Sequence, residues 1–447
     1  MKTNQNIFKA YDIRGIYKKD LDDDTAYNIG RAVVSYSNAT KIVVGKDIRK
    51  SSNNLEQALV NGITDQGADV IKIGLSTTPL LYFASGQLDV DLGIIITASH
   101  NPAEYNGFKI CRKKAVPIGE GTGMEEIKKL TLNKNFSNPA NKGTISENNN
   151  INKIYIDYIT NFFNKIGNKK KIVIDFANAM GIMDKPVFEK LKDFIQPIYL
   201  YDNYDGLFPN HEANPLKIET LKKLQEKVIS VNADFGISYD GDADRVGFVD
   251  EKGNIVPMDF ITALIAKEIL KEKQNSLILI DLRSSNAVKE AIENAGGKVK
   301  LCRVGHSLIK KQMREQNAIF AGELSGHYYF QENNNAEMAT LAILKILNIL
   351  NKSNKKMSEL SDELKIYSHS GEINSTVKDI EIIFNKLEKK YKTGKIIKLD
   401  GIRIDFENWW FNVRASNTEP VIRLNLEAKT QKLMEEKKNE ILKIIRE

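Results

Sequence analysis

The strongest constraint on the fold of this chain is a regular alternation of short apolar runs with amphipathic stretches of helical length, which continues over most of its 447 residues. Runs such as 41–45, 171–176 and 276–281 are rich in Ile, Val and Leu. The stretches between them repeat with the helical period. This alternation favours an α/β architecture, and the length suggests about three domains of roughly 150 residues with room for a small fourth.

Breaks in the pattern divide the chain. A polar, Asn-rich segment ends near residue 150, residues 250–253 predict a hairpin turn, and the element order changes near residue 370. We therefore expect three similar mixed-sheet α/β domains over 1–150, 151–250 and 251–368, and a smaller α+β domain over 369–447. The second domain is expected to include a helix near 184–194, and the fourth a strand over 395–406.

Composition excludes several classes of protein. With 42% hydrophobic and 28% charged residues, the chain has no apolar run near the ~18 residues of a membrane span. Its N-terminus lacks the apolar core of a signal peptide, so we expect a cytoplasmic protein without a membrane partner. The net charge of +7 is spread over 65 basic and 58 acidic residues, a pattern more typical of solubility than of nucleic-acid binding. Cys111 and Cys302 are expected to be buried thiols.

The first candidate reactive group is a serine at the end of an apolar run. Residues 92–97 predict a strand, and Ser99, His100 and Pro102 follow in the loop after it. Adjacent side chains of an extended segment point to opposite sides, so His100 is expected to be a poor base for Ser99. No Gly-x-Ser-x-Gly elbow supports a serine hydrolase. A simple turn would explain the motif in isolation, so its interpretation depends on the other loops.

A second loop, Asp-Gly-Asp-Ala-Asp-Arg, carries carboxylates at Asp240, Asp242 and Asp244. A calcium-binding EF-hand is the alternative, because these residues and Glu251 fall at its ligand positions. Arg245 stands where that loop needs glycine, however, and both flanks are strand-like rather than helical. In a locally extended loop the carboxylates would share one face and bind one cation. Room would remain for a phosphate oxygen, which Arg245 would also bind.

Two further polar clusters each follow or precede a predicted strand. Gly-Glu-Leu-Ser-Gly-His contains Glu323, Ser325 and His327, which suit hydrogen bonds to sugar hydroxyls. The second cluster, 414–420, combines a guanidinium, two hydroxyls and an amide and suits a phosphate group. A polar turn is the alternative for each cluster on its own.

Taken together, the four loops resemble those of the α-D-phosphohexomutase family. They occur in the family's order, one per domain, over nearly the whole chain. The resemblance implies three α/β domains and a smaller C-terminal domain around a central cleft. It further implies a mutase that moves a phosphoryl group between hexose positions through a phosphoserine and a hexose 1,6-bisphosphate intermediate.

The same resemblance assigns roles to individual residues. It implies catalytic roles for Ser99, His100, Lys109 and Arg245. It implies one Mg²⁺ per chain, held by Asp240, Asp242, Asp244 and Ser99. Substrate binding would fall to Tyr11, Arg14, Arg283, His306, Glu323, Ser325, His327, Arg414, Ser416, Asn417 and Thr418. Hexose phosphates would be the partners, a hexose 1,6-bisphosphate would prime the enzyme, and the chain would be a monomer or weak homodimer.

The segment around Leu324 resembles the phosphomannomutase and phosphoglucomutase subgroup more than the phosphoglucosamine enzymes, which tend to carry Gln there. Arg283 departs from the Lys common in that subgroup, which would alter sugar contacts. The leading hypothesis is therefore a mutase for mannose or glucose phosphates. Phosphoglucosamine mutase is the close alternative, and a non-catalytic protein that binds metal or sugar phosphate is a more distant one.

Overall fold

The computed structural model describes residues 3–165, 167–377, 379–415 and 421–446. Its first unit is a seven-stranded mixed sheet in the order β1-β5-β4-β2-β3-β7, with β6 paired to β5. The strands are β1 (Ile13–Ile16), β2 (Lys41–Lys46), β3 (Asp69–Leu75), β4 (Leu92–Ile96), β5 (Tyr105–Arg112), β6 (Val116–Pro117) and β7 (Ile145–Glu147). The helical segments are η1 (Gln5–Ile7), α1 (Asp23–Ser37), α2 (Ser52–Asp65), α3 (Thr78–Gln87), η2 (Lys113–Ala115) and α4 (Met124–Asn133).

The second and third units each contain a five-stranded sheet, ordered β12-β11-β10-β8-β9 and β14-β13-β15-β16-β17. The second has β8 (Lys170–Asp175), β9 (Ile195–Leu200), β10 (Phe235–Tyr239), β11 (Val246–Asp250), β12 (Ile255–Val256), α5 (Ile151–Thr160), η3 (Met180–Asp184), α6 (Lys185–Lys190) and α7 (Ile218–Ser230). The third has β13 (Leu277–Asp281), β14 (Lys298–Cys302), β15 (Phe320–Gly322), β16 (Tyr328–Phe330), β17 (Ala336–Glu337), α8 (Met258–Glu272), α9 (Asn286–Asn294), α10 (His306–Gln316), η4 (Gln331–Asn333), α11 (Ala339–Ser353) and α12 (Met357–Asp362).

These three units repeat one strand order. Three parallel strands lie side by side as β3-β2-β4, β9-β8-β10 and β14-β13-β15. In each unit the third of them pairs with the next strand in antiparallel fashion, as β4 with β5, β10 with β11, and β15 with β16. The expected similarity of the three α/β units is therefore present in their topology.

The repeat determines where the candidate loops lie. The serine loop joins β4 to β5, the aspartate loop joins β10 to β11, and the sugar loop, residues 323–327, joins β15 to β16. All three loops thus occupy the same connection of the same sheet pattern. Function gathers at loops that a rigid scaffold positions, and here one scaffold is used three times.

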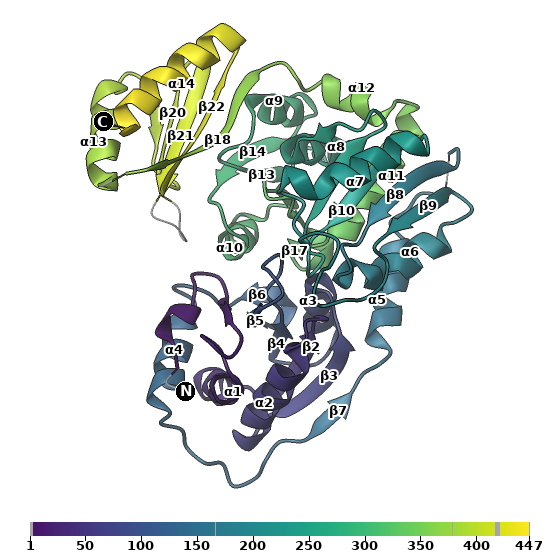
Figure 1. Ribbon diagram of the computed structural model, residues 1–447, viewed down its shortest axis with the longest axis vertical. Coiled ribbons are helices and arrows are strands. Elements are labelled where there is room, and N and C mark those ends of the chain that lie inside the picture. Colours follow the sequence, from purple (N-terminus) through teal and green to yellow (C-terminus); the bar gives the residue numbers. More distant parts are fainter. Residues whose placement is uncertain (1–2, 166, 378, 416–420, 447) are drawn as a thin grey trace.

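The fourth unit is a five-stranded antiparallel sheet in the order β18-β22-β21-β20-β19. Its elements are β18 (Ser368–Thr376), α13 (Ile380–Lys390), β19 (Lys395–Ile397), β20 (Ile402–Asp405), β21 (Trp409–Ala415), β22 (Val421–Ala428) and α14 (Gln431–Arg446). It has its own apolar core, whereas the largest core cluster combines residues of the first three units, such as Leu80, Ile237 and Ile343. In Figure 1 the fourth unit (yellow) accordingly stands apart from the others at the upper left.

Several details differ from the sequence-based expectations. The helix expected near 184–194 is only the six-residue α6, and the strand expected over 395–406 is split into β19 and β20. Helices α10 and α11 were not anticipated. In α11 eleven of the fifteen residues are buried, including all of 339–344. The helix therefore begins as a largely apolar run, and such a run alone does not distinguish a helix from a strand.

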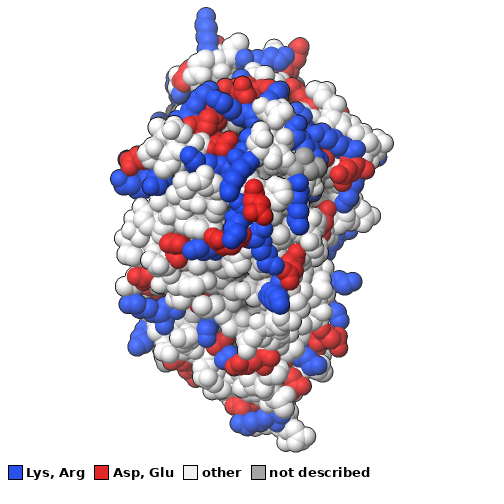
Figure 2. All heavy atoms as spheres, turned by 90° about the vertical axis from the view of Figure 1, so that its right-hand side faces the viewer, with Lys and Arg blue, Asp and Glu red and all other residues white. Residues whose placement is uncertain are grey.

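The surface carries both signs of charge. On the face drawn in Figure 2, Lys and Arg side chains are interspersed with Asp and Glu. Exposed ion pairs of the molecule include Lys223–Glu226 at 2.8 Å. Cys111 and Cys302 are both buried, as expected. Among the described residues, no helix has the length and apolar character needed to span a membrane.

Candidate active site

The serine loop presents Ser99 in a strained and buried conformation. Its φ is 50°, in the left-handed region that non-glycine residues rarely adopt, and only 1% of the residue is exposed. The Ser99 amide donates to Thr97 Oγ1 at 3.0 Å, and Ser99 Oγ donates to Asp240 Oδ2 at 3.0 Å. The hydroxyl is therefore aimed at the aspartate loop of the second unit.

The guanidinium of Arg49 holds the serine loop in this shape. It donates to the carbonyl oxygens of Ser99 and Asn101, each at 2.7 Å, and to that of Pro102 at 2.5 Å. Asp47 orients Arg49 through a 3.0 Å contact from Nε to Oδ2. A planar donor fork that satisfies several carbonyls can stabilise a strained loop, and strain of this kind marks functional sites.

The aspartate loop closes through its own side chains. Asp240 Oδ1 accepts the amides of Asp244 and Arg245, each at 3.1 Å, and Ala243 adopts a φ of 61°. The loop is therefore a tight turn and not the extended segment expected from the alternate carboxylates. It nevertheless brings the carboxylate oxygens of Asp240, Asp242 and Asp244 within 4.8 Å of one another.

Lys109, from β5 of the first unit, balances this charge. Its Nζ lies 2.6 Å from an oxygen of Asp242 and 2.6 Å from one of Asp244. Burial opposes protonation of Lys109, but the two carboxylates outweigh it and raise the pKa of the ammonium. Burial, with repulsion from Asp244 and Asp242, raises the pKa of Asp240 well above its usual range. The negative charge of Asp240 is therefore incompletely compensated by the positive side chains around it.

The aspartate cluster fits a hard divalent cation. Within the described part of the chain, Asp242 Oδ1 is buried and accepts no hydrogen bond, and Asp244 Oδ1 is met only by the ring of His327, at 3.2 Å, and by Arg245, at 3.8 Å. Oxygen atoms are the ligands that Mg²⁺ and Ca²⁺ prefer, and a buried carboxylate oxygen without a hydrogen-bond donor is stabilised when a cation binds it. Ser99 Oγ, at hydrogen-bond distance from Asp240, would bring an attached phosphate to the same cation.

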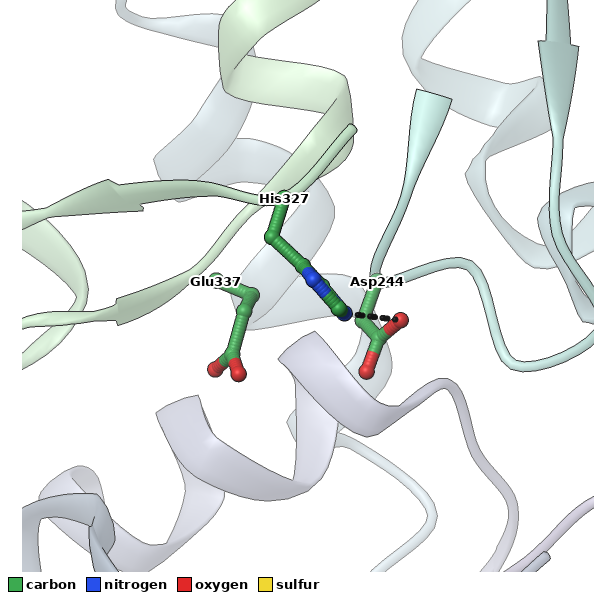
Figure 3. Close-up of side chains that lie close together, drawn as sticks. All are labelled: Asp244, His327 and Glu337. Carbon is green, nitrogen blue, oxygen red and sulfur yellow. Dashed lines mark ion pairs between the residues drawn. The ribbon is translucent and has the colours of Figure 1, made fainter. Parts of the chain in front are cut away.

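The sugar loop is connected to the aspartate loop through His327. One ring nitrogen, Nδ1, lies 2.7 Å from Ser325 Oγ and 3.0 Å from Glu323 Oε2. The other, Nε2, lies 3.2 Å from Asp244 Oδ1, as the dashed line in Figure 3 shows. Burial opposes the charged form of His327, but Asp244 outweighs it and the pKa of His327 rises to about 9. Its imidazolium therefore joins the two loops at neutral pH.

These loops line a cavity of about 880 Å³ between the first unit and the second and third. The cavity is lined by Tyr11, Arg14, His100, Lys109, Arg245, His306 and His327. Tyr11 donates to the Val304 carbonyl at 3.1 Å, and Arg14 donates to Asn101 of the serine loop. The N-terminal segment thus lies against both the serine loop and the third unit.

The remaining predicted ligand-binding residues lie between the third and fourth units. Arg283 is held by Asp281 at 2.5 Å and lies 3.3 Å from Glu372 Oε2. The same carboxylate lies 4.0 Å from Arg414, so Glu372 stands between the two arginines. Neither arginine lines the cavity described above. Ser416, Asn417 and Thr418 fall outside the described residues.

Comparison with known proteins identifies the family. Sequence models for phosphoglucomutase/phosphomannomutase domains I, II, III and the C-terminal domain match residues 5–138, 153–253, 257–367 and 372–444. The chain belongs to the phosphoglucomutase/phosphomannomutase family. This family is that of the α-D-phosphohexomutases, so the chain is an enzyme of the mutase type.

Individual members of the family are similar over their whole length. A phosphomannomutase from Methanocaldococcus jannaschii is 44% identical over 445 residues, which cover 98% of this chain and 97% of that protein. A phosphomannomutase/phosphoglucomutase from Pseudomonas aeruginosa is 35% identical over 455 residues, covering 96% and 93%. The solved structure of a family protein from Burkholderia thailandensis superposes with a TM-score of 0.90 at 29% identity and covers 99% and 97% of the two chains. The expected fold and enzyme class are thus confirmed.

The position of His100 differs from the sequence-based expectation. His100 Nδ1 lies 3.3 Å from Ser99 Oγ, because the left-handed φ of Ser99 turns both side chains to the same side. Burial, with the positive charges of Arg245 and Arg14, lowers the pKa of His100 well below its usual range. A neutral imidazole therefore accompanies the serine of this phosphohexomutase.

Sequence reasoning missed Arg49 and Thr78 in this mutase site. Thr78, at the start of α3, donates to Asp242 Oδ2 at 2.5 Å and thereby ties the first unit to the aspartate loop. For Arg49, the only signal in the sequence was the polar segment with Asp47, Arg49 and Ser51 after the strand at 41–45, which resembles an ordinary polar turn. The role of Arg49 depends on its contacts with Ser99 and Asn101, which lie 50 and 52 positions later in the sequence.

Proposed function

We propose that this mutase interconverts the 6-phosphate and 1-phosphate of mannose or glucose, with Ser99 carrying the phosphoryl group. The observation that carries this proposal is the 3.0 Å hydrogen bond from Ser99 Oγ to the acidic cluster of the second unit. Phospho-Ser99 would add two negative charges and a set of acceptor oxygens beside that cluster. The proposal agrees with the names of the most similar relatives, which are phosphomannomutases and phosphomannomutase/phosphoglucomutases.

The reaction consists of two transfers of opposite sense. In the first, the bond between Ser99 Oγ and phosphorus breaks and a sugar hydroxyl forms the new bond to phosphorus. A base of the site takes the proton of that hydroxyl, and Ser99 Oγ gains a proton to become a hydroxyl. The hexose 1,6-bisphosphate then turns around, and its other phosphoryl group returns to Ser99. The neutral imidazole of His100, 3.3 Å from Ser99 Oγ, would accept or return the proton of the serine hydroxyl.

Mg²⁺ would be held by Asp240, Asp242 and Asp244 together with an oxygen of phospho-Ser99. When bound, the ion withdraws charge from the phosphoryl oxygens. Arg245 is half-buried beside this cluster, with Nε 3.7 Å from Asp240 Oδ2, and would neutralise charge on the transferring group. Lys109 would hold the carboxylates in position through its two 2.6 Å contacts.

Glu323, Ser325 and His327 would orient the sugar ring, with His306 beside them in the cavity. Tyr11 and Arg14 would border the bound ligand. Arg414, with Arg283 nearby and Ser416, Asn417 and Thr418 after it, would bind the phosphate that does not react. Leu324 favours mannose and glucose phosphates over the glucosamine series, for which phosphoglucosamine mutase is the second candidate.

The conditions of activity follow from this chemistry. A hexose 1,6-bisphosphate would prime the enzyme by phosphorylating Ser99, and one Mg²⁺ would bind per chain. Hexose phosphates would be its partners, without nucleic acid or membrane, and the near balance of 65 basic and 58 acidic residues supports that choice. We expect a cytoplasmic monomer or weak homodimer with domain boundaries near residues 150, 250 and 368.

One assay tests the proposal. The full chain is incubated with Mg²⁺, a trace of hexose bisphosphate, and mannose, glucose or glucosamine 1-phosphate in turn, and formation of the 6-phosphate is followed. Turnover of mannose or glucose with loss of activity in Ser99→Ala is the expected result. Turnover of glucosamine alone would assign the chain to the second candidate. Mg²⁺ binding without any turnover would overturn the mutase assignment for this chain.

A further inference from the structure

Three polar side chains lie together behind the sugar loop. His306 and Lys310 are four residues apart on α10, so both point from the same face of the helix. That face meets Glu337 of β17. Lys310 Nζ lies 3.0 Å from Glu337 Oε2, and His306 Nδ1 lies 3.5 Å from Glu337 Oε1. One carboxylate therefore faces both residues, one through each oxygen.

This group is buried, and it is incompletely hydrogen-bonded. Lys310 and Glu337 are both 0% exposed. Among the described residues, Glu337 Oε1 and His306 Nδ1 have no hydrogen-bond partner although both atoms are buried. Their separation is slightly beyond hydrogen-bond length, and buried polar atoms normally find a partner. A small rotation of the imidazole would satisfy both atoms, provided that the proton is on Nδ1.

We propose that Glu337 is a positioning residue that fixes the tautomer of His306, with the proton on Nδ1 and the lone pair on Nε2. Lys310 supplies the countercharge that allows Glu337 to be buried in this place. The inference rests on the proposed function only where it concerns the sugar, because His306 lines the ligand cavity.

The surroundings of His306 fix its place without determining its tautomer. Its ring meets that of Tyr11 edge-on, with the centroids 5.6 Å apart. Gly305 precedes it with a φ of 122°, and a Cβ there would lie 2.5 Å from the Tyr11 ring. Burial, with the positive charges of Lys310 and Lys109, lowers the pKa of His306 well below its usual range. A neutral ring has two tautomers, and the carboxylate beside Nδ1 favours one of them.

A second metal ion is the alternative reading of this region, because Asp244, His327 and Glu337 offer ligand atoms within 4.8 Å of one another (Figure 3). Positive side chains already contact both carboxylates. Lys310 donates to Glu337, and Arg245 lies 3.8 Å from Asp244 Oδ1. His327 Nε2 is itself engaged with Asp244 Oδ1 at 3.2 Å, so two of the three groups already have partners, and the contact with His306 accounts better for Glu337 than a metal ion does.

The tautomer has a consequence for recognition. With the proton on Nδ1, the remaining ring nitrogen accepts a hydrogen bond, so His306 would select a hydroxyl or another donor on the sugar. With the proton on Nε2 it would present a donor instead. Glu337, which is buried and does not line the cavity, would thereby determine whether His306 accepts or donates the hydrogen bond to the sugar.

Nitrogen-15 NMR of the full chain labelled with [¹⁵N]histidine tests the inference. The His306 signals are assigned by their loss in His306→Asn, and the tautomer is taken from the ring-nitrogen shifts near pH 8. The test variant is Lys310→Met with Glu337→Met, which removes the acceptor and its countercharge together and leaves no unpaired buried charge. Asn348→Leu is the matched control, because Asn348 is also buried but hydrogen-bonds to Phe162 and Asn164 instead.

We expect the wild-type protein and the Asn348→Leu variant to show His306 protonated at Nδ1, and the double variant to shift toward the Nε2-protonated form that histidine favours in water. An Nε2-protonated wild type, or an unchanged tautomer in the double variant, would overturn the inference. Kinetics separate it from the proposed function: the double variant should raise KM for the hexose phosphate roughly fivefold, the effect of one weakened hydrogen bond. A changed tautomer with an unchanged KM would remove His306 from sugar binding and leave the role of Glu337 intact.

Discussion

Ser99 Oγ donates a 3.0 Å hydrogen bond to Asp240 Oδ2, across 141 residues of sequence and between two separate sheets. The two side chains come from equivalent loops, since each follows the third parallel strand of its unit. Their meeting therefore depends on how the first and second units pack. Both the reactive hydroxyl and the acidic cluster are buried at this contact.

The Arg49 guanidinium should be necessary for turnover. Arg49→Lys keeps the charge beside Asp47 but cannot donate to three loop carbonyls in one plane, so the serine loop should move. A displacement of about 1 Å at a reacting group lowers kcat by roughly a hundredfold. Steady-state kinetics measure this loss. Arg31→Lys is the control, because Arg31 binds Gln66 and the Ser137 carbonyl far from Ser99, and equal losses in the two variants would refute a specific role for Arg49.

Gly241 should tolerate no side chain. A Cβ at this position would lie 2.2 Å from the Ser99 carbonyl oxygen, so Gly241→Ala must push the serine and aspartate loops apart. We expect a stability loss of about 2 kcal/mol and little phosphorylation of Ser99 by hexose bisphosphate, measured by intact mass. Gly121→Ala is the control, since its φ of 68° makes alanine unfavourable while nothing lies within 4 Å of the new atom. Full phosphorylation of the Gly241→Ala variant would contradict this expectation.

Lys109 should compete with the metal ion. Its ammonium lies 2.6 Å from both Asp242 and Asp244, so Lys109→Met leaves two buried carboxylates without their cation. The metal-free variant should unfold at a lower temperature than the wild type, and added Mg²⁺ should raise its midpoint by a larger increment. Differential scanning calorimetry with EDTA and with Mg²⁺ measures both effects. An equal or smaller increment in the variant would show that Lys109 and the metal do not share these carboxylates.

Asp184 should make stability depend on pH. Burial raises the pKa of Asp184 to about 7, against the hydrogen bond from Thr340. Because the folded-state pKa exceeds the unfolded value of 3.8, the associated stability is full below about pH 4 and is lost as the pH rises through 7. The loss is on the order of 4 kcal/mol.

Asp184→Asn removes this titration. The variant should be more stable than the wild type at pH 8 and should lose that advantage at pH 4, as measured by urea unfolding at both values. Asp205→Asn is a suitable control, because the Asp205 side chain accepts a hydrogen bond from the Leu207 amide at a half-buried loop. A stability difference between wild type and Asp184→Asn that does not change with pH would contradict the raised pKa.

The units and their loops could be predicted from sequence because each carries a local signal. Apolar runs mark β4, β10 and β15, and the polar motifs follow such runs directly. Sequence patterns did not predict the elements whose conformation depends on packing against other parts of the chain. Helix α11 begins as a largely apolar run whose residues 339–344 are all buried, and such a run does not reveal a helical period. The three carboxylates were expected to converge through an extended loop, but they converge through a turn that Asp240 itself closes.

Contacts between units could not be predicted from the sequence, because they too depend on packing. Lys109 was identified only by resemblance, and its place between Asp242 and Asp244 depends on the packing of the first unit against the second. Arg49 carries no motif at all. The wrong direction predicted for His100 came from assuming extended backbone at Ser99, whose positive φ is maintained by that same arginine.

The threefold strand order has one more consequence. Since the nucleophile, the acidic cluster and the sugar loop each belong to a different sheet, no single unit folded in isolation would contain a working catalytic centre. The first unit alone would contain Ser99 without the aspartate loop of the second unit or the sugar loop of the third. Reactivity in this chain therefore depends on the packing of the three units, which share one large apolar core.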